Sequence, residues 1–211
     1  MKQNKTELIV VLDRSGSMET IRTDMEGALK ALVEKQAGEK GECLFSLYQF
    51  DNQYEPVLEQ VHIGNVSKSS LVLEPRGGTA LVDAIGRTIN SVGERLKNTN
   101  EADRPETVIM TIITDGEENA SREYTSDKVK EMVKHQTDKY QWKFLFLGSN
   151  IDAVKTGSRY GFNVNNSMSY NSSAKGVANT SATLNNAVSY MRSCNLDYQF
   201  TDEERDKAME K

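Results

Sequence analysis

The hydrophobic pattern of the chain begins with a strong strand signal. Residues 8–12 are continuously apolar, and residues 108–113 are apolar apart from one threonine. Short apolar runs of this kind predict strands that are buried on both faces, as in the middle of a parallel sheet. Residues 44–50 and 142–147 predict two further strands, and residues 164–169 a weaker one.

Helical periodicity fills the segments between these strands. Apolar residues at a spacing of three and four predict helices over residues 19–37, from 77–79 through residue 96, and over 126–139. A short helix is expected over residues 152–159 and a final one over 174–194. The last dozen residues are mostly charged, and we expect them to fray.

One segment breaks the alternation of strands and helices. A polar turn at residues 51–53 joins the strand at 44–50 directly to an expected strand at 54–63, so the two must pair as an antiparallel hairpin. Pro56, Glu59 and Gln60 fit a strand at the edge of a sheet. The predicted fold is therefore α/β and doubly wound, with a mostly parallel central sheet, one antiparallel edge strand and helices on both faces.

Composition narrows the classes of function. A chain of 211 residues with a net charge of −5 and no basic run with interleaved aromatics does not favour nucleic acid as a partner. The N-terminus lacks the apolar core of a signal peptide and no window approaches a membrane span, so we expect a cytoplasmic protein that does not bind membranes. Cys43 and Cys194 are expected to be free thiols in a reducing compartment.

Oxygen-bearing side chains gather at the predicted carboxyl ends of the two buried strands. Asp13, Ser15 and Ser17 occupy alternate positions directly after residues 8–12, so their side chains point the same way in an extended loop. Asp115 follows residues 108–113, and Thr79 begins the helix that precedes that strand. Right-handed crossovers place the two strands side by side, which brings the five side chains together as a cage of hard oxygens suited to Mg²⁺, Mn²⁺ or Ca²⁺.

These residues carry a family resemblance. The sequence Asp13-Arg14-Ser15-Gly16-Ser17, the pair Gly78-Thr79 and the run Thr114-Asp115-Gly116 together resemble the metal-ion-dependent adhesion site of von Willebrand factor A domains. The expected hairpin also matches the single antiparallel edge strand of that family. The chain looks like the stand-alone bacterial or phage type, with the domain over residues 1–170 and a polar helical extension over residues 171–211 packed on it.

The resemblance implies a function. Ser15, Ser17 and Thr79 would ligate a divalent ion, expected to be Mg²⁺, while Asp13 and Asp115 would bind it directly or through water. The ion would then accept an Asp or Glu side chain of a partner protein at an open coordination position. We expect a binding module without catalytic residues. The alternatives are a metal-dependent hydrolase of the phosphatase type and a structural component that assembles with copies of itself.

Simpler roles compete for several of these positions. Ser17 and Thr79 can each be read as helix N-caps, and Asp83 as either a support of the site or an ordinary polar helix position. Arg14 is expected to be a surface charge, and Glu117 and Glu118 to be solvated loop charges. We expect His62 and His135 to lie on the surface, away from any site.

Overall fold

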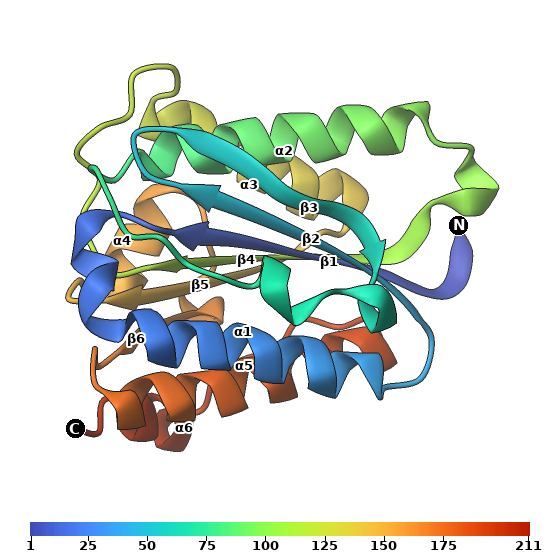
Figure 1. Cartoon of the computed structure of the whole chain (residues 1–211). Coiled ribbons are helices and arrows are strands. Elements are labelled where there is room, and N and C mark those ends of the chain that lie inside the picture. The colour runs from blue at the N-terminus through green and yellow to red at the C-terminus, as the bar shows by residue number, and fades with distance from the viewer.

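A six-stranded sheet forms the centre of the molecule (Figure 1). The computed structural model describes the backbone of residues 1–211 and every side chain except those of residues 2 and 3. The strands lie in the order β3-β2-β1-β4-β5-β6, and only β3 is antiparallel to its neighbour. Their bounds are β1 (Lys2–Asp13), β2 (Glu42–Phe50), β3 (Tyr54–His62), β4 (Pro105–Thr114), β5 (Lys143–Ser149) and β6 (Ser167–Tyr170).

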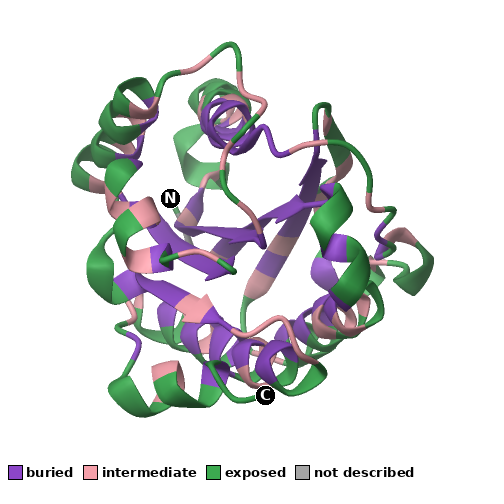
Figure 2. Cartoon of the chain, turned by 90° about the vertical axis from the view of Figure 1, so that its left-hand side faces the viewer, coloured by how far each residue is buried: buried purple, intermediate pink, exposed green. Residues whose placement is uncertain are grey.

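Helices cover both faces of the sheet (Figures 1 and 2). One face carries α1 (Arg22–Ala37), α5 (Ala174–Cys194) and α6 (Asp202–Ala208). The other carries α2 (Leu81–Asn98), α3 (Ser126–Tyr140) and α4 (Ala153–Arg159). This arrangement confirms the predicted doubly wound α/β fold and its antiparallel edge strand.

Alternation along β1 explains why the core has two halves. Leu8, Val10 and Leu12 pack with α1 and α5, while Ile9 and Val11 pack with α2 and α3. All five side chains are fully buried, because successive residues of a strand point to opposite faces and both faces of this sheet are covered. The apolar run of residues 8–12 is thus part of the central strand of the core.

Most element boundaries lie within a few residues of the prediction. β1 begins at Lys2, six residues before the apolar run, the helix expected from residues 77–79 begins at Leu81, and residues 164–166 form a 3₁₀ turn ahead of β6. The helix expected over residues 19–37 begins as a 3₁₀ helix (Gly16–Ile21) and becomes α-helical at Arg22. The final helix over residues 174–194 is confirmed. Cys43 is buried, Cys194 is exposed, and both are free thiols, as expected.

The expectation that the last dozen residues fray is wrong. They form α6, which begins with a capping box in which Thr201 and Glu204 each bind the backbone N–H of the other. Phe200 and Ala208 are buried in the same half of the core as α5, so the charged segment is anchored by apolar contacts at both of its ends.

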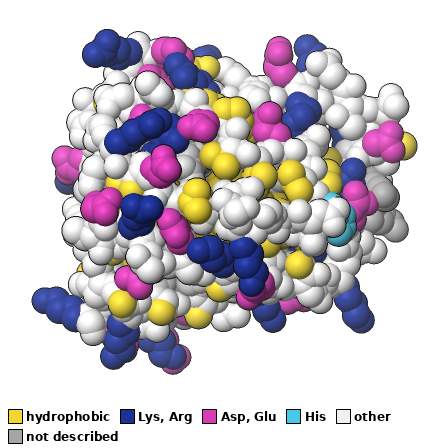
Figure 3. All heavy atoms as spheres, viewed as in Figure 1, with side chains coloured by type: hydrophobic (Ala, Val, Ile, Leu, Met, Phe, Trp, Pro, Cys, Tyr) yellow, Lys and Arg dark blue, Asp and Glu magenta, His cyan; other side chains and the backbone are white. Residues whose placement is uncertain are grey.

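The surface gives no sign of a basic binding face on the side seen in Figure 3, where acidic and basic side chains are intermixed. Among the described residues, no helix is both long enough and apolar enough to cross a bilayer.

Candidate metal site

The site lies where β1 and β4 end. These strands are adjacent and parallel, with Leu12 opposite Ile113, so the residues that follow them emerge side by side. The prediction that the first and fourth strands are neighbours is therefore confirmed. Parallel α/β sheets offer a crevice at this carboxyl edge, because the connections on either side of the central strands lead to opposite faces.

Asp13 fixes the first turn of the loop after β1. Its side chain is fully buried; Oδ1 accepts a hydrogen bond from the Ser15 backbone N–H at 2.7 Å, and Oδ2 accepts one from Thr114 Oγ1 at 2.6 Å. Thr114 was not among the candidate residues from sequence, since Asp13, the carboxylate that its hydroxyl binds, lies 101 positions away. Asp13 thereby ties the ends of β1 and β4 together.

A chain of short contacts joins the serines to Asp115. The hydroxyl oxygens of Ser15 and Ser17 lie 3.1 Å apart, and Ser17 donates to Asp115 Oδ1 at 2.7 Å. The second carboxylate oxygen of Asp115, Oδ2, is buried and has no hydrogen-bond partner. A buried carboxylate oxygen without a donor is costly, so this atom marks a position where a cation would be favourable.

Thr79 approaches the same point from the third segment. A methyl group at Gly116 would lie 3.6 Å from Thr79 Oγ1 and 3.7 Å from Ser17 Oγ, which places both hydroxyls around residue 116. The loop that carries Thr79 is tied to the β1 loop, because the Gly16 N–H donates to the Gly77 carbonyl at 3.2 Å. Gly77 has φ +68°, and a side chain there would collide with Asn52, so this close approach requires glycine.

A second loop holds Thr79 from the other side. The Thr79 N–H donates to Asn119 Oδ1 at 2.9 Å, and the Asn119 N–H returns a bond to the Thr79 carbonyl at 3.0 Å. Asp83 supports this loop, since its carboxylate accepts the backbone N–H groups of residues 122, 123 and 124 at 2.7 to 2.9 Å. Of the two roles left open for Asp83, the structure therefore shows the supporting one.

Two charges expected at the surface have structural roles instead. Glu118 is not simply solvated: its carboxylate accepts the N–H groups of Val82, Ala120 and Ser121, and so caps the start of α2. Arg14 is only 5% exposed and donates to Asp51 at 3.0 Å. Both expectations failed because the partners lie far away in sequence or depend on the fold of the loop.

The readings of Ser17 and Thr79 as helix caps are wrong. Ser17 donates to Asp115 rather than capping α1, and α2 has Ala80 at its N-cap with no side-chain capping bond. His62 and His135 are exposed and distant from these loops in the fold, as expected.

The electrostatics of the site also fit a cation. Burial raises the pKa of Asp13 to about 6, although hydrogen bonds from Thr114 and Ser15 oppose the shift. Burial likewise raises the pKa of Asp115. No group of three His, Cys, Asp or Glu side chains suited to a metal occurs among the described residues, so any metal here would rely on the three hydroxyls as well as the two carboxylates.

The fold compares well with solved structures. Over 94% of this chain and 98% of the other, it matches the von Willebrand factor domain of the type V pili tip protein Mfa5 from Porphyromonas gingivalis, with a TM-score of 0.63 and 9% sequence identity. The chain has the fold of a von Willebrand factor A domain. At such low identity the likeness establishes the fold alone.

Two further structures with this fold differ more in length. A von Willebrand factor type A protein from Catenulispora acidiphila matches with a TM-score of 0.60 and 12% identity over 87% of this chain and 42% of the other. Proximal thread matrix protein 1 from the mussel byssus, with a zinc-occupied metal-ion-dependent adhesion motif, matches with a TM-score of 0.62 and 14% identity over 90% and 47%. The chain thus spans less than half of the length of these two proteins. No protein-family model and no curated protein matches it in sequence.

Proposed function

We propose that this von Willebrand factor A domain binds a divalent cation through Asp13, Ser15, Ser17, Thr79 and Asp115, and captures a protein partner through that cation. The observation that carries the proposal is the buried, unpartnered Oδ2 of Asp115 beside the hydroxyl of Ser17. A cation there would satisfy this oxygen and would use the free lone pairs of the neighbouring hydroxyls.

The donor set favours a hard ion. Carboxylate and hydroxyl oxygens without thiolate or imidazole suit Mg²⁺, Mn²⁺ or Ca²⁺, and we propose Mg²⁺ as the resident ion. The zinc in the mussel protein is in keeping with a divalent ion at a site of this kind. Both oxygens of Asp13 already accept hydrogen bonds, so Asp13 is suited to hold the ion through its remaining lone pairs or through water.

The open side of the site favours a protein ligand with an acidic side chain. Ser17 is exposed, and Gly116 places no side chain next to the hydroxyls of Ser17 and Thr79. Two carboxylates at most balance a divalent ion and the hydroxyls add no charge, so with Asp13 bound through water the ion would remain attractive to one more carboxylate.

A binding role fits this arrangement better than catalysis. Both histidines lie away from the site, so neither can act there as a general base. We therefore propose that the chain is not an enzyme.

The test is isothermal titration calorimetry with Mg²⁺ and Mn²⁺ on the wild type, Asp115→Ala and Glu117→Gln. Glu117 is an exposed acid two residues from Asp115 and has no hydrogen bond to the site, so Glu117→Gln is the matched control. We expect metal binding in the wild type and in the control, and a loss of about a hundredfold or more in Asp115→Ala, since a direct charged ligand is removed. Equal affinities in all three proteins would contradict the proposal.

The partner is tested by pull-down with Mg²⁺ present. Proteins that the wild type and Glu117→Gln retain should be lost with EDTA and with Asp115→Ala. If the same proteins are retained in the presence of EDTA and by Asp115→Ala, the partner binds elsewhere on the molecule.

A further inference from the structure

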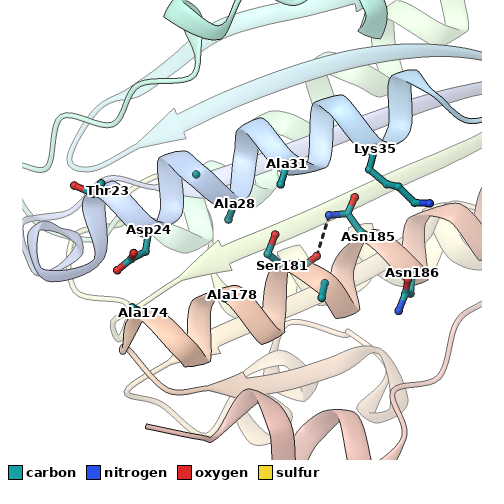
Figure 4. A pocket seen from close by; sticks show the side chains of 12 residues that line it. Thr23, Asp24, Ala28, Ala31, Lys35, Ala174, Ala178, Ser181, Asn185 and Asn186 are labelled. Carbon is teal, nitrogen blue, oxygen red and sulfur yellow. Dashed lines mark hydrogen bonds between the residues drawn. The ribbon is translucent and has the colours of Figure 1, made fainter.

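A groove runs along the outside of the molecule between α1 and α5, which lie side by side and point the same way (Figure 4). Its volume is about 580 Å³. Small residues form its walls: Gly27, Ala28 and Ala31 on α1, and Ala174, Ala178 and Ala182 on α5. This surface lies outside the candidate metal site and has no part in the function proposed above.

No contact within the chain explains why position 27 is a glycine. It lies inside α1, where glycine costs about 0.5–1 kcal/mol relative to alanine. A methyl group at this position would meet nothing within 4 Å, whereas one at Gly86 of α2 would collide with the ring of Tyr124. Packing inside the fold therefore explains Gly86 but not Gly27, and the close approach of another backbone would explain it.

Asn185 leaves a buried acceptor at one end of the groove. The residue is 9% exposed, and its Nδ2 donates to the Ser181 carbonyl at 3.1 Å, the contact drawn in Figure 4. Its Oδ1 has no hydrogen-bond partner. The terminal torsion of asparagine is broad, so a small rotation would bring this oxygen to a donor seated in the groove.

The charges along the groove are self-complementary. Asp24 lies at one end and Lys35 at the other (Figure 4). Asp24 has no hydrogen bond or ion pair with the described side chains, and Lys35 contacts only Glu39, one turn away on its own chain segment. Residues 24, 28, 31 and 35 follow a 4-3-4 spacing that keeps them on one face of α1. A two-fold axis between Ala28 and Ala31 would pair each Asp24 with a Lys35.

We propose that this face is the interface of a symmetric homodimer, in which α1 of a second copy packs antiparallel against α1 along the edge of the groove. Lys35 would then meet Asp24 of the partner subunit, and Asn185 would meet Thr23 of the partner subunit, whose hydroxyl supplies the missing donor. Gly27 and the alanines allow the two helices to approach closely. Because the contact is between helices, it does not need the metal.

The proposal is tested by sedimentation equilibrium over a range of protein concentrations, with and without EDTA. We expect the mass to rise from one chain to two, unchanged by EDTA. Lys35→Asp should weaken the dimer by about tenfold, since it replaces two attractions by two repulsions, and the double variant Asp24→Lys/Lys35→Asp should restore it. Lys30→Asp makes the same charge change on α1 outside the groove and should have no effect.

A filling variant tests the groove independently of charge. Position 27 is exposed, a methyl group there meets nothing within 4 Å, and leucine improves helix propensity, so Gly27→Leu should fold with an unchanged or higher melting temperature and remain monomeric. A wild type that stays monomeric at every concentration would overturn the proposal. A dimer that dissociates in EDTA would also overturn it, and would indicate assembly through the metal site. A dimer whose affinity is unchanged by Lys35→Asp would overturn it as well, and would indicate assembly through another surface.

Discussion

At the scale of single residues, Asp51 joins the loops that flank the site. Arg14 and Arg76 both donate to its Oδ2, at 3.0 and 2.8 Å, and the Gln53 N–H donates to its Oδ1. Burial alone would raise the pKa of Asp51, but the hydrogen bonds from Arg76 and Gln53 and the charge of Arg14 lower it below its ordinary value. The ionised carboxylate therefore stabilises the folded state.

The lowered pKa predicts a pH-dependent cost for Asp51→Asn. A group with a depressed folded pKa contributes its full stability above its unfolded pKa of about 3.9, and this contribution is lost as the pH falls through the folded pKa. Urea unfolding should show Asp51→Asn less stable than the wild type by about 1–3 kcal/mol at pH 7, with the difference shrinking below about pH 4. Glu74→Gln, at an exposed acid on the same loop as Arg76, is the control and should change stability little. A difference that does not vary with pH would contradict the role of the charge.

Individual residues could be predicted from sequence where the pattern is local. The alternate spacing of Asp13, Ser15 and Ser17 shows directly that they share a loop. The burial of Arg14 could not be predicted, because its partner Asp51 lies 37 residues away on the turn of a hairpin. The same holds for Glu118, which binds the Val82 N–H across 36 residues. Polar contacts of this kind depend on which loops meet in the folded chain, and the periodicity of apolar residues carries no information about which loops meet.

At the scale of elements, α6 closes the far edge of the sheet. Arg205 donates to the Ser167 carbonyl of β6 at 2.6 Å, and the Asn171 N–H donates to the Ala208 carbonyl at 2.9 Å. The start of this helix was readable from sequence, since Thr201 is followed three residues later by Glu204, the spacing of a capping box. The prediction of fraying relied on the charged composition of the segment and did not use the spacing of Thr201 and Glu204.

The capping box predicts a measurable loss in Thr201→Ala. Its hydroxyl accepts the Glu204 N–H at 3.2 Å, and the Glu204 carboxylate accepts the Thr201 N–H at 2.9 Å. Loss of the cap should lower the free energy of unfolding by about 1 kcal/mol in chemical denaturation. Asp206→Ala, at an exposed position within α6, serves as the control and should stay close to the wild type. Equal stability of Thr201→Ala and the wild type would mean that α6 is held by its apolar contacts alone.

At the scale of the whole molecule, the candidate site depends on the order of the strands. The central position of β1, between β2 and β4, brings Asp13 and Asp115 together although they are about a hundred residues apart. This adjacency could be predicted, because strand–helix–strand connections are right-handed and buried runs mark the central strands. The groove between α1 and α5 could not, since a sequence shows which face of a helix is apolar but not which helix lies beside it.

A site assembled from three distant segments should couple metal binding to global stability. The native fold alone brings the five oxygen-bearing residues together, so a divalent ion bound only to that state stabilises it by RT ln(1 + [L]/Kd), about 2.7 kcal/mol at a hundred times Kd. For a chain of this length we expect Mg²⁺ to raise the melting temperature by about 5–10 °C in scanning calorimetry. The rise should vanish in Asp115→Ala and persist in Glu117→Gln. An equal rise in Asp115→Ala would place the stabilising ion elsewhere on the molecule, because that variant lacks the carboxylate whose unpartnered oxygen marks the site.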